Sequence, residues 1–331
     1  MKYCEVIPGE TNSVVAFEAE QYIVKPAFGM SGSDVKIFKE WKDAKQYAES
    51  LDNSKEWVPP HVARALKIGR TDTRIIEPYI DGTEFSIDGW IQDQNIRALV
   101  QHKLKVIQRT PDGDRPMVSP TMGSVCLSNE WSFIGDGPTV SPLMNSACLP
   151  KGKGWSGLKN SEESICNFGR AVLDAMGFSE GVFHIEGRER QSDARLFLIE
   201  VNPRAPGGSL WKSARLRTGD DLEVDDLMVQ LGKPVPPPNT PTHRYVLHYP
   251  FYAANPGILS HWGDLVGPKV RAVPGLTIDF AVQRGHRFRE KDMSEEPYLA
   301  FAVTYDDTVE GLFAKCQAIL DFNPPRVHPV P

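Results

Sequence analysis

The amino-acid sequence predicts an α+β fold built in two parts. Short apolar segments of strand character alternate with helical segments, and residues 160–178 read as a strongly amphipathic helix. A proline-rich stretch at 233–244 cannot continue regular structure, so it marks the main boundary. With 331 residues, 40% of them hydrophobic, the chain is long enough for two domains or for one domain with a large appendage.

The elements ahead of the boundary can be placed from their apolar patterns. Strands are expected at 21–26, 73–80, 83–91 and 95–107. A polar-faced helix is expected at 39–50, and the Pro-, Gly- and Ser-rich residues 110–160 are expected to be mostly loop. Beyond the boundary, a smaller β-rich unit closes with a helix around 307–322.

The helix at 160–178 carries signals at both ends. Asn160 or Ser161 can cap its first turn, which also contains two glutamates, and Gly177 ends it. The stripe expected to face the core is Ile165, Phe168, Val172, Ala175 and Met176.

Composition excludes several classes of protein. A formal net charge of −6 and the lack of a basic block argue against nucleic acid as the main partner. No signal peptide and no apolar run of about 20 residues is present, so a cytoplasmic protein without a membrane span is expected. The five cysteines form no C-x-x-C pair, which favours reduced thiols.

The segment 183–204 places charged residues within two apolar strands. If these strands form a hairpin whose turn centres on Asp193, Glu186 lies opposite Glu200 and His184 lies opposite Asn202. One face then carries His184, Glu186, Arg188, Glu200, Asn202 and Arg204. The other face, expected to join the core, carries Phe183, Ile185, Phe197, Ile199 and Val201.

The paired glutamates allow two interpretations. Two facing carboxylates repel each other unless a cation lies between them, and Mg²⁺ is a hard ion that carboxylate oxygens bind well. The alternative is a solvated strand face on which Arg188 and Arg204 neutralise the acids. This segment alone leaves both interpretations open.

The N-terminal half adds a candidate phosphate site. Lys25 follows a strand and precedes small residues, Gly29, Ser31, Gly32 and Ser33, whose backbone N–H groups could hold phosphate oxygens. The loop matches neither the P-loop nor the dinucleotide fingerprint, and an ordinary turn is the alternative. Glu77 and Glu84 lie on the next two strands, where Pro78 favours a connector; either acid could simply be a surface residue.

Taken in order, these motifs resemble the ATP-grasp superfamily, and within it the carboxylate–amine ligases of the L-amino-acid ligase type. The resemblance covers about residues 20–325 and depends on the Lys-Pro and Gly/Ser loop, "EPYIDGTEFSID", "HIEGR", "FLIEVNPRAPGG", "TGDDLEVDDLMVQLGKPV" and "ANPGILSHWGDL". It implies two α/β lobes that clasp ATP and a small β-rich C-terminal subdomain. The expected divisions are 1–80, 81–235 and 236–331.

The resemblance also implies nucleotide-binding residues. Lys25 would contact ATP phosphates, and the loop at 29–33 would close over them. Glu77 and the backbone near Tyr79 and Ile80 would meet the adenine at the hinge between the lobes, and Glu84 would hold the ribose.

The remaining implied roles concern the reaction. Glu186, Glu200 and Asn202 would bind Mg²⁺, or Mn²⁺, bridging the ATP phosphates. Arg204 would steady an acyl phosphate, and Gly207 and Gly208 would lie where the carboxylate substrate meets backbone amides. His184 and Arg188 could contact substrate or phosphate, or could be structural.

One departure from the family pattern concerns the N-terminus. Members usually carry a further α/β domain and more of the ATP-clasping lobe, with another phosphate-contacting lysine, ahead of the Lys25 motif. Lys2, Lys103 or Lys105 could take the place of that lysine, with solvated positions for all three as the alternative. A homodimer or a partner subunit could also complete the site.

Three functions are therefore open. The first is an ATP- and Mg²⁺-dependent ligase that joins small carboxylate and amine substrates, with amino acids among the candidates, through an acyl phosphate. The second is a nucleotide-binding subunit or pseudoenzyme that needs a partner chain. The third is an ATP-grasp phosphotransferase.

Overall fold

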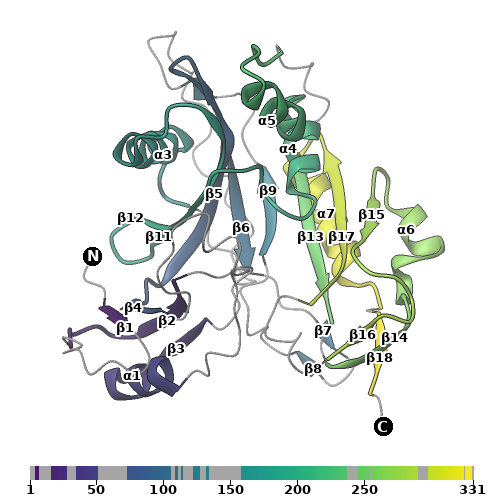
Figure 1. Cartoon of the computed structure of the whole chain (residues 1–331). Helices are drawn as coiled ribbons and strands as arrows, with labels where there is room; N and C mark the ends of the chain where they lie inside the picture. The colour runs from purple at the N-terminus through teal and green to yellow at the C-terminus, as the bar shows by residue number, and fades with distance from the viewer. Residues whose placement is uncertain are drawn as a thin grey trace.

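The fold is described from a computed structural model of the chain, in which two antiparallel sheets of four and nine strands dominate (Figure 1). The structure describes residues 4–6, 16–27, 35–50, 73–105, 109–110, 113–114, 122–126, 132–133, 158–236, 245–253, 255–289, 297–323 and 325–329. Helices and antiparallel sheets together confirm the predicted α+β class.

The four-stranded sheet forms a small N-terminal lobe with one helix. Its strand order is β1-β4-β2-β3. The elements are β1 (Cys4–Val6), β2 (Tyr22–Pro26), β3 (Lys36–Phe38), β4 (Arg74–Pro78) and α1 (Trp41–Ser50). Val24, Ile76, Ala44 and Ala48 are all fully buried, so the alternating strand residues pack against one face of α1.

A three-residue connector joins the two sheets. β4 ends at Pro78 and β5 begins at Gly82, so 79–81 are the only residues between them. Pro78 itself pairs with Tyr22 at the end of β4, although the sequence suggested a connector there. A terminal strand position suits proline, because the missing N–H is needed only in the strand interior.

The nine-stranded sheet is the centre of the molecule. Its main order is β12-β11-β5-β6-β9-β13-β17-β15, and β10 also pairs with β6. The strands are β5 (Gly82–Gln92), β6 (Asn95–Lys105), β9 (Met122–Cys126), β10 (Ser132–Phe133), β11 (Gly181–Arg190), β12 (Leu196–Asn202), β13 (Tyr245–Tyr252), β15 (Thr277–Phe280) and β17 (Tyr298–Asp306). A separate two-stranded ribbon pairs β7 (Arg109–Thr110) with β8 (Gly113–Asp114).

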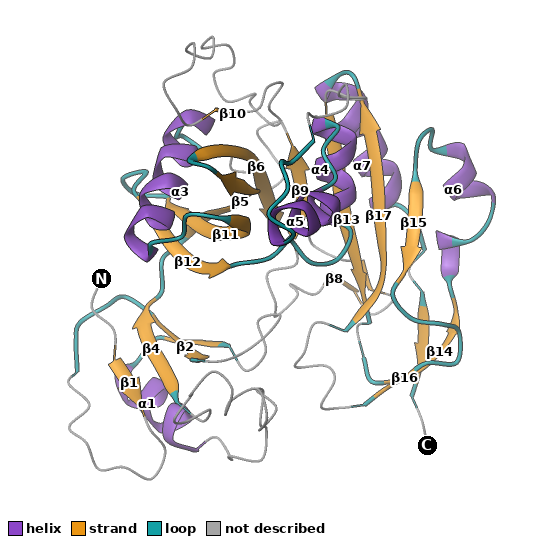
Figure 2. Cartoon of the chain, turned by 45° about the horizontal axis from the view of Figure 1, so that its top comes forward, coloured by secondary structure: helices purple, strands orange, loops and turns teal. Residues whose placement is uncertain are grey.

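Helices cover opposite faces of this sheet (Figure 2). On one face α3 (Glu162–Met176) packs against Phe85, Ile87, Phe183 and Ile185. On the other face α4 (Leu210–Thr218) and α5 (Leu222–Gln230) contribute Ala214 and Leu222 to a cluster with strand residues. The sheet face that α4 and α5 cover carries polar residues at its end nearest the small lobe. The candidate site lies at this polar end.

The expected cap residues of α3 are confirmed. The Ser161 side chain accepts a hydrogen bond from the Ser164 N–H, and Gly177 adopts a left-handed conformation with φ of 66°. The expected core stripe is wrong at its end, because Ala175 and Met176 are exposed. Phe178, just after the helix, packs against the core there instead.

The C-terminal residues continue the large sheet and add a smaller one. β13, β17 and β15 extend the sheet beyond β9, a strand that falls where mostly loop was expected. The remaining elements are β14 (Gly257–His261), β16 (Arg287–Phe288), β18 (Arg326–His328), the 3₁₀ helix η1 (Gly263–Leu265), α6 (Pro268–Ala272) and α7 (Val309–Leu320). The division at residue 236 stays a prediction.

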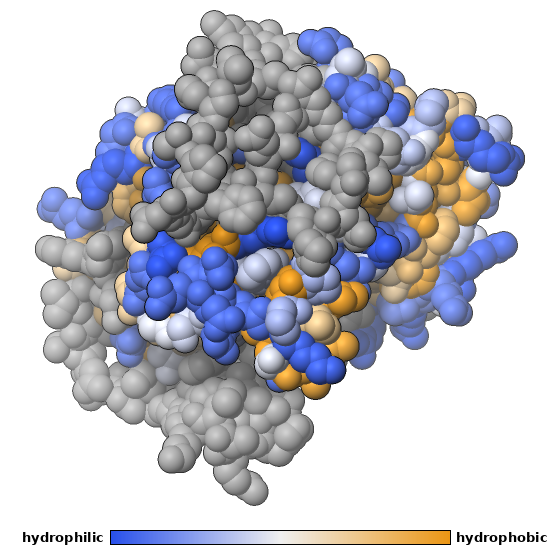
Figure 3. Space-filling view, turned by 90° about the horizontal axis from the view of Figure 1, so that it is seen from above, coloured by the Kyte–Doolittle hydropathy of each residue, from blue (hydrophilic) through white to orange (hydrophobic). Residues whose placement is uncertain are grey.

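The described surface, cysteines and helices can be compared with the expectations from composition. Viewed from above, hydrophilic and hydrophobic residues alternate on the described surface (Figure 3), and α5 exposes Val224, Leu227 and Leu231. Cys4, Cys166 and Cys316 take part in no disulfide, as expected; the side chains of Cys126 and Cys148 lie outside the described residues. Of the helices described, none has the length and apolar character needed to span a bilayer.

Candidate active site

Glu186 and Glu200 form the centre of the candidate site. They are directly paired across β11 and β12, as are His184 and Asn202, so the predicted pairing of these four residues is confirmed. Ligand atoms of His184, Glu186 and Glu200 all lie within 4.8 Å of one another. The Asn202 amide donates to Glu200 Oε1 at 2.7 Å. These oxygen atoms form a donor set that suits a hard divalent cation.

A buried carboxylate lies behind this group. Asp88, on β5, is paired with His184 and is fully buried. Its Oδ1 lies 2.5 Å from His184 Nδ1, while Oδ2 accepts hydrogen bonds from Gln101 Nε2 at 2.5 Å and from Ser86 Oγ at 2.9 Å. The other ring nitrogen, His184 Nε2, lies 3.0 Å from Glu186 Oε1.

The electrostatics of His184 follow from these neighbours. Burial lowers the pKa of the imidazole, but the carboxylates of Asp88 and Glu186 outweigh it and raise the pKa to about 9. Without a cation nearby, the ring at neutral pH is therefore charged and can donate hydrogen bonds to both carboxylates.

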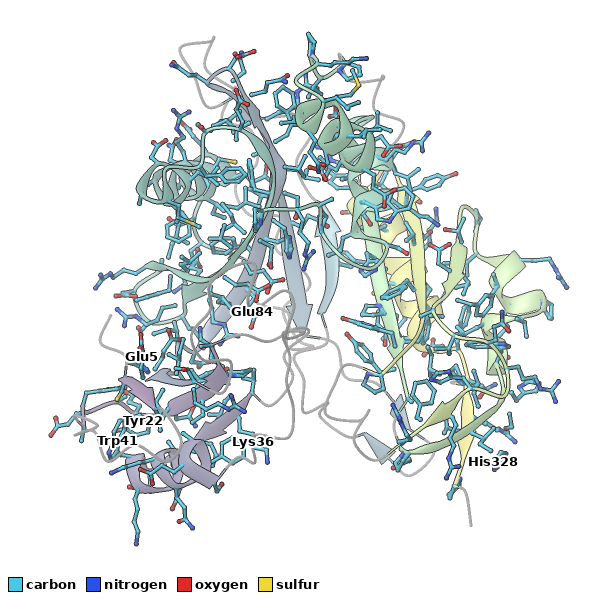
Figure 4. All side chains as sticks on the ribbon, in the orientation of Figure 1. Glu5, Tyr22, Lys36, Trp41, Glu84 and His328 are labelled. Atoms are coloured by element: carbon cyan, nitrogen blue, oxygen red, sulfur yellow. The ribbon has the colours of Figure 1, made fainter. Side chains whose placement is uncertain are left out.

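Arg188 ties the large sheet to the connector. Its guanidinium forms an ion pair with Glu84, donates to the Ile80 carbonyl oxygen at 2.8 Å and lies over the Tyr79 ring at 5.0 Å. Both charged side chains are largely buried. Figure 4 labels Glu84 at the end of β5 that lies toward the small lobe. Arg188 thus brings Glu84, Tyr79 and Ile80 together at the connector between the sheets, and their roles in binding a nucleotide stay predictions.

Lys25 and Glu77 meet on the small sheet. Lys25 Nζ lies 2.7 Å from Glu77 Oε2, and each side chain is about a quarter exposed, at 24%. The predicted loop residues Gly29, Ser31, Gly32 and Ser33 lie outside the described residues, as does Lys2; Lys103 and Lys105 are described only in their backbone.

The segment after β12 leads into α4. Arg204 is exposed and donates to the Ala205 carbonyl oxygen at 2.8 Å. Gly207 and Gly208 are exposed, and Gly208 has a φ of 61°, which favours glycine. Asp279 fixes the start of α4, accepting hydrogen bonds from Ser209 Oγ at 2.8 Å and from Lys212 Nζ at 2.6 Å.

One expected face is wrong. The register of the hairpin shifts after Glu186, so that Gly187 pairs with Leu198 and Arg188 pairs with Phe197. Ile199 is the extra residue of this bulge, and Phe197 therefore shares a face with Arg188 instead of joining the core. The guanidinium groups of Arg190 and Arg195 lie over its ring at 4.8 and 5.6 Å.

Sequence reasoning missed Ser86, Asp88 and Gln101. A signal for two of them was present, because the strand at 83–91 alternates apolar Phe85 and Ile87 with polar Ser86 and Asp88. Their burial depends on packing beside β11, which no local pattern reveals.

Two sheets joined by a short hinge, with facing glutamates on the large sheet, define an ATP-grasp fold. Comparison with known proteins supports this fold through structure alone. No protein-family model matches the chain, and no curated protein matches it by sequence.

Three solved structures illustrate the likeness. An L-amino acid ligase from Bacillus licheniformis superposes with a TM-score of 0.66 at 15% identity, covering 99% of this chain and 69% of that one. N5-carboxyaminoimidazole ribonucleotide synthetase from Thermotoga maritima gives 0.55 at 12% identity, with 93% and 63% covered. The biotin carboxylase domain of Hydrogenobacter thermophilus 2-oxoglutarate carboxylase, solved with MgADP and bicarbonate, gives 0.55 at 13%, with 93% and 58% covered.

Proposed function

We propose that the protein is an ATP- and Mg²⁺-dependent ligase that joins a small carboxylate to an amine, with amino acids as the leading substrate class. The fold shared with an L-amino acid ligase, a ribonucleotide synthetase and a biotin carboxylase domain solved with MgADP supports this proposal. The observation that carries it is the direct pairing of Glu186 with Glu200 beside Asn202, on the polar face of the large sheet.

The pair fits a divalent cation. Two carboxylates facing each other across neighbouring strands are unfavourable without a positive charge between them. A divalent cation held there, Mg²⁺ or Mn²⁺, would supply positive charge that offsets the charge developing during phosphoryl transfer. Glu186, Glu200 and Asn202 would be its protein ligands.

The hinge would hold the nucleotide. Glu77, Tyr79 and Ile80 are at or beside the connector between the sheets, where an adenine could be clasped, and Glu84 lies next to them for the ribose. Lys25, now paired with Glu77, would supply charge to the phosphates together with the loop at 29–33.

The reaction would proceed in two balanced steps. A carboxylate oxygen of the substrate attacks the γ-phosphorus of ATP, which forms an acyl phosphate and releases ADP. The amine then attacks the activated carbonyl carbon, forming the amide, releasing phosphate and losing a proton. Arg204 would stabilise the acyl phosphate, while Gly207 and Gly208 would present backbone N–H groups to the carboxylate.

The test measures ADP and phosphate release by the full chain with Mg²⁺-ATP, pooled amino acids and small carboxylates, with and without amine acceptors. Glu200→Gln removes a ligand charge and should abolish release while the protein stays folded. Glu180→Gln is the matched control, since Glu180 is an exposed residue just ahead of β11. Equal turnover by Glu200→Gln and the wild type would overturn the assignment.

Product analysis separates the alternative functions. An amide detected by mass spectrometry supports the ligase, whereas a phosphorylated product without an amide indicates a phosphotransferase. ATP binding without acceptor-dependent turnover in any mixture indicates a nucleotide-binding subunit or pseudoenzyme.

A further inference from the structure

Asp88 is the centre of a buried polar network directly behind the facing glutamates. Its two carboxylate oxygens contact groups from three neighbouring strands: Ser86 on β5, Gln101 on β6 and His184 on β11. Ser86, Asp88 and Gln101 are all 0% exposed. A buried carboxylate is costly unless it is well hydrogen-bonded, so these contacts hold Asp88 in one orientation.

The network leads through one side chain to the candidate metal site. His184 is held at Nδ1 by Asp88 at 2.5 Å and reaches Glu186 Oε1 with Nε2 at 3.0 Å. The imidazole is 4% exposed, so packing restricts it as well. A carboxylate held by a hydrogen bond pays less conformational entropy when it binds a cation.

We propose that Asp88 and His184 are positioning residues that fix Glu186 opposite Glu200 for the divalent cation. This inference rests on the proposed function, because it concerns the same site. Asp88 orients the ring, and the ring orients the Glu186 carboxylate. Metal affinity would then depend on two residues that do not themselves bind the metal.

The alternative role for His184 is that of a direct ligand. Its nearest ring nitrogen lies within 4.8 Å of the ligand atoms of both glutamates. However, Nδ1 is engaged by Asp88 and Nε2 points to a Glu186 oxygen, so both nitrogens already have carboxylate partners. Mg²⁺ also prefers oxygen to imidazole nitrogen. Geometry and ligand preference therefore both favour positioning.

Two substitutions of His184 separate its contact with Asp88 from its contact with Glu186. In His184→Gln, the amide can take the place of Nε2 and still donate to Glu186. In His184→Asn, the shorter amide can take the place of Nδ1 beside Asp88 but cannot reach Glu186. His286→Asn is the control, because His286 is exposed and packs against Phe288 in the C-terminal sheet.

The experiment titrates Mn²⁺ into the full chain with ADP and follows unbound Mn²⁺ by electron paramagnetic resonance. His184→Asn should weaken Mn²⁺ binding by about 10- to 100-fold, the usual effect of losing a partner of a metal ligand. His184→Gln keeps the hydrogen bond to Glu186 but loses the one to Asp88, so its loss of affinity should be smaller than that of His184→Asn. Circular dichroism melting curves establish that each variant is folded.

Each remaining outcome is decisive. If the wild type binds Mn²⁺ and His184→Asn binds it equally well, the positioning role is wrong while the proposed function stands. A nitrogen coupling in the pulsed spectrum of the wild-type Mn²⁺ complex that His184→Gln abolishes would make His184 a direct ligand and also overturn it. A wild type that binds no Mn²⁺ with ADP overturns the proposed metal site, and this inference with it.

Discussion

Glu186 and Glu200 face each other directly across β11 and β12, and the register of this hairpin shifts by one residue immediately afterwards. The bulge places Gly187 opposite Leu198 on β12, while on the other side Gly187 is paired with Phe85 on β5. The Phe85 ring fills the space above the glycine, since a Cβ added to Gly187 would lie 2.6 Å from Phe85 Cε2. Gly187 therefore connects the site to the core: it follows Glu186 directly, and its lack of a side chain leaves room for the Phe85 ring.

This packing predicts that Gly187→Ala destabilises the protein. Phe85 is fully buried among core residues, so it has little room to yield to a new methyl group. Overpacking of this kind costs about 1–3 kcal/mol. Urea unfolding followed by tryptophan fluorescence measures the change.

Gly207→Ala is the matched control for stability. A Cβ at that position meets no atom within 4 Å, so the free energy of unfolding should change by no more than about 0.5 kcal/mol. Equal stability of Gly187→Ala and the wild type would contradict the packing described for Phe85.

The pairing of Glu186 with Glu200 and of His184 with Asn202 could be predicted from sequence, because the alternation along the first strand buries Phe183 and Ile185 together. The bulge could not, because an inserted residue changes neither composition nor the apolar pattern around Ile199. Its presence reversed the expected face of Phe197. Between the turn and the bulge, the observed pairing is one residue off the register expected for a turn centred on Asp193.

In the candidate site, too, some residues could be predicted from sequence and others could not. Lys25, Glu77, Glu84 and the two facing glutamates lie in motifs that have fixed order along the chain. Asp88 ends the segment "EPYIDGTEFSID", but the segment gave it no role, because that role depends on β5, β6 and β11 lying side by side in one sheet. Long-range strand order is the information that a single sequence lacks.

Because Arg188 and Glu84 form a buried ion pair, we expect removal of one charge to lower the stability of the fold more than removal of both charges. Arg188→Met leaves the Glu84 carboxylate buried beside the hinge without its cation. Removing one partner of a buried pair costs about 3–5 kcal/mol. Thermal or urea unfolding of this variant should show a loss of that size.

A double substitution checks the cause. Glu84→Leu combined with Arg188→Met removes both charges and should recover much of the lost stability. Stability losses that simply add would show that each side chain is stabilised by other contacts, such as that of Arg188 with the Ile80 carbonyl.

Because the pKa of the Asp225 carboxyl is raised, we expect the protein to become less stable as pH rises. Burial, with Asp220 nearby, raises the pKa of this carboxyl from 3.8 to about 7, and its Oδ2 has no hydrogen-bond partner within the described structure. Between pH 4 and pH 7 the folded state therefore holds a proton that the unfolded chain has lost, so stability decreases as pH rises through this window. The slope from one proton is at most about 1.4 kcal/mol per pH unit.

Asp225→Asn should remove this contribution and make the variant more stable than the wild type at pH 8. Urea unfolding at several pH values between 4 and 8 measures it. Asp226→Asn, one position along α5, is the control and should keep the slope because Asp225 remains. A slope that persists in Asp225→Asn would assign it to another group.

Because the pKa of the His248 imidazole is lowered, we expect this residue to make the protein less stable as pH falls. It is buried on β13 and stacks on Phe301 with ring centroids 5.4 Å apart, and neither ring nitrogen has a hydrogen-bond partner among the described residues. Burial lowers the pKa of the imidazole from 6.5 to about 3, with Asp279 opposing the shift. The unfolded chain binds a proton here below pH 6.5, whereas the folded chain does so only near pH 3, so stability falls as pH falls through this window.

His248→Phe keeps the stacking on Phe301 and removes the titrating group. The stability of this variant should decline less steeply than that of the wild type between pH 6.5 and pH 4, by up to about 1.4 kcal/mol per pH unit. His328→Phe is the control, because His328 is exposed at the C-terminal edge of the molecule (Figure 4). If the two variants show the same slope, His248 has a hydrogen-bond partner or a water in solution, and its imidazole titrates in the folded protein much as it does in the unfolded chain.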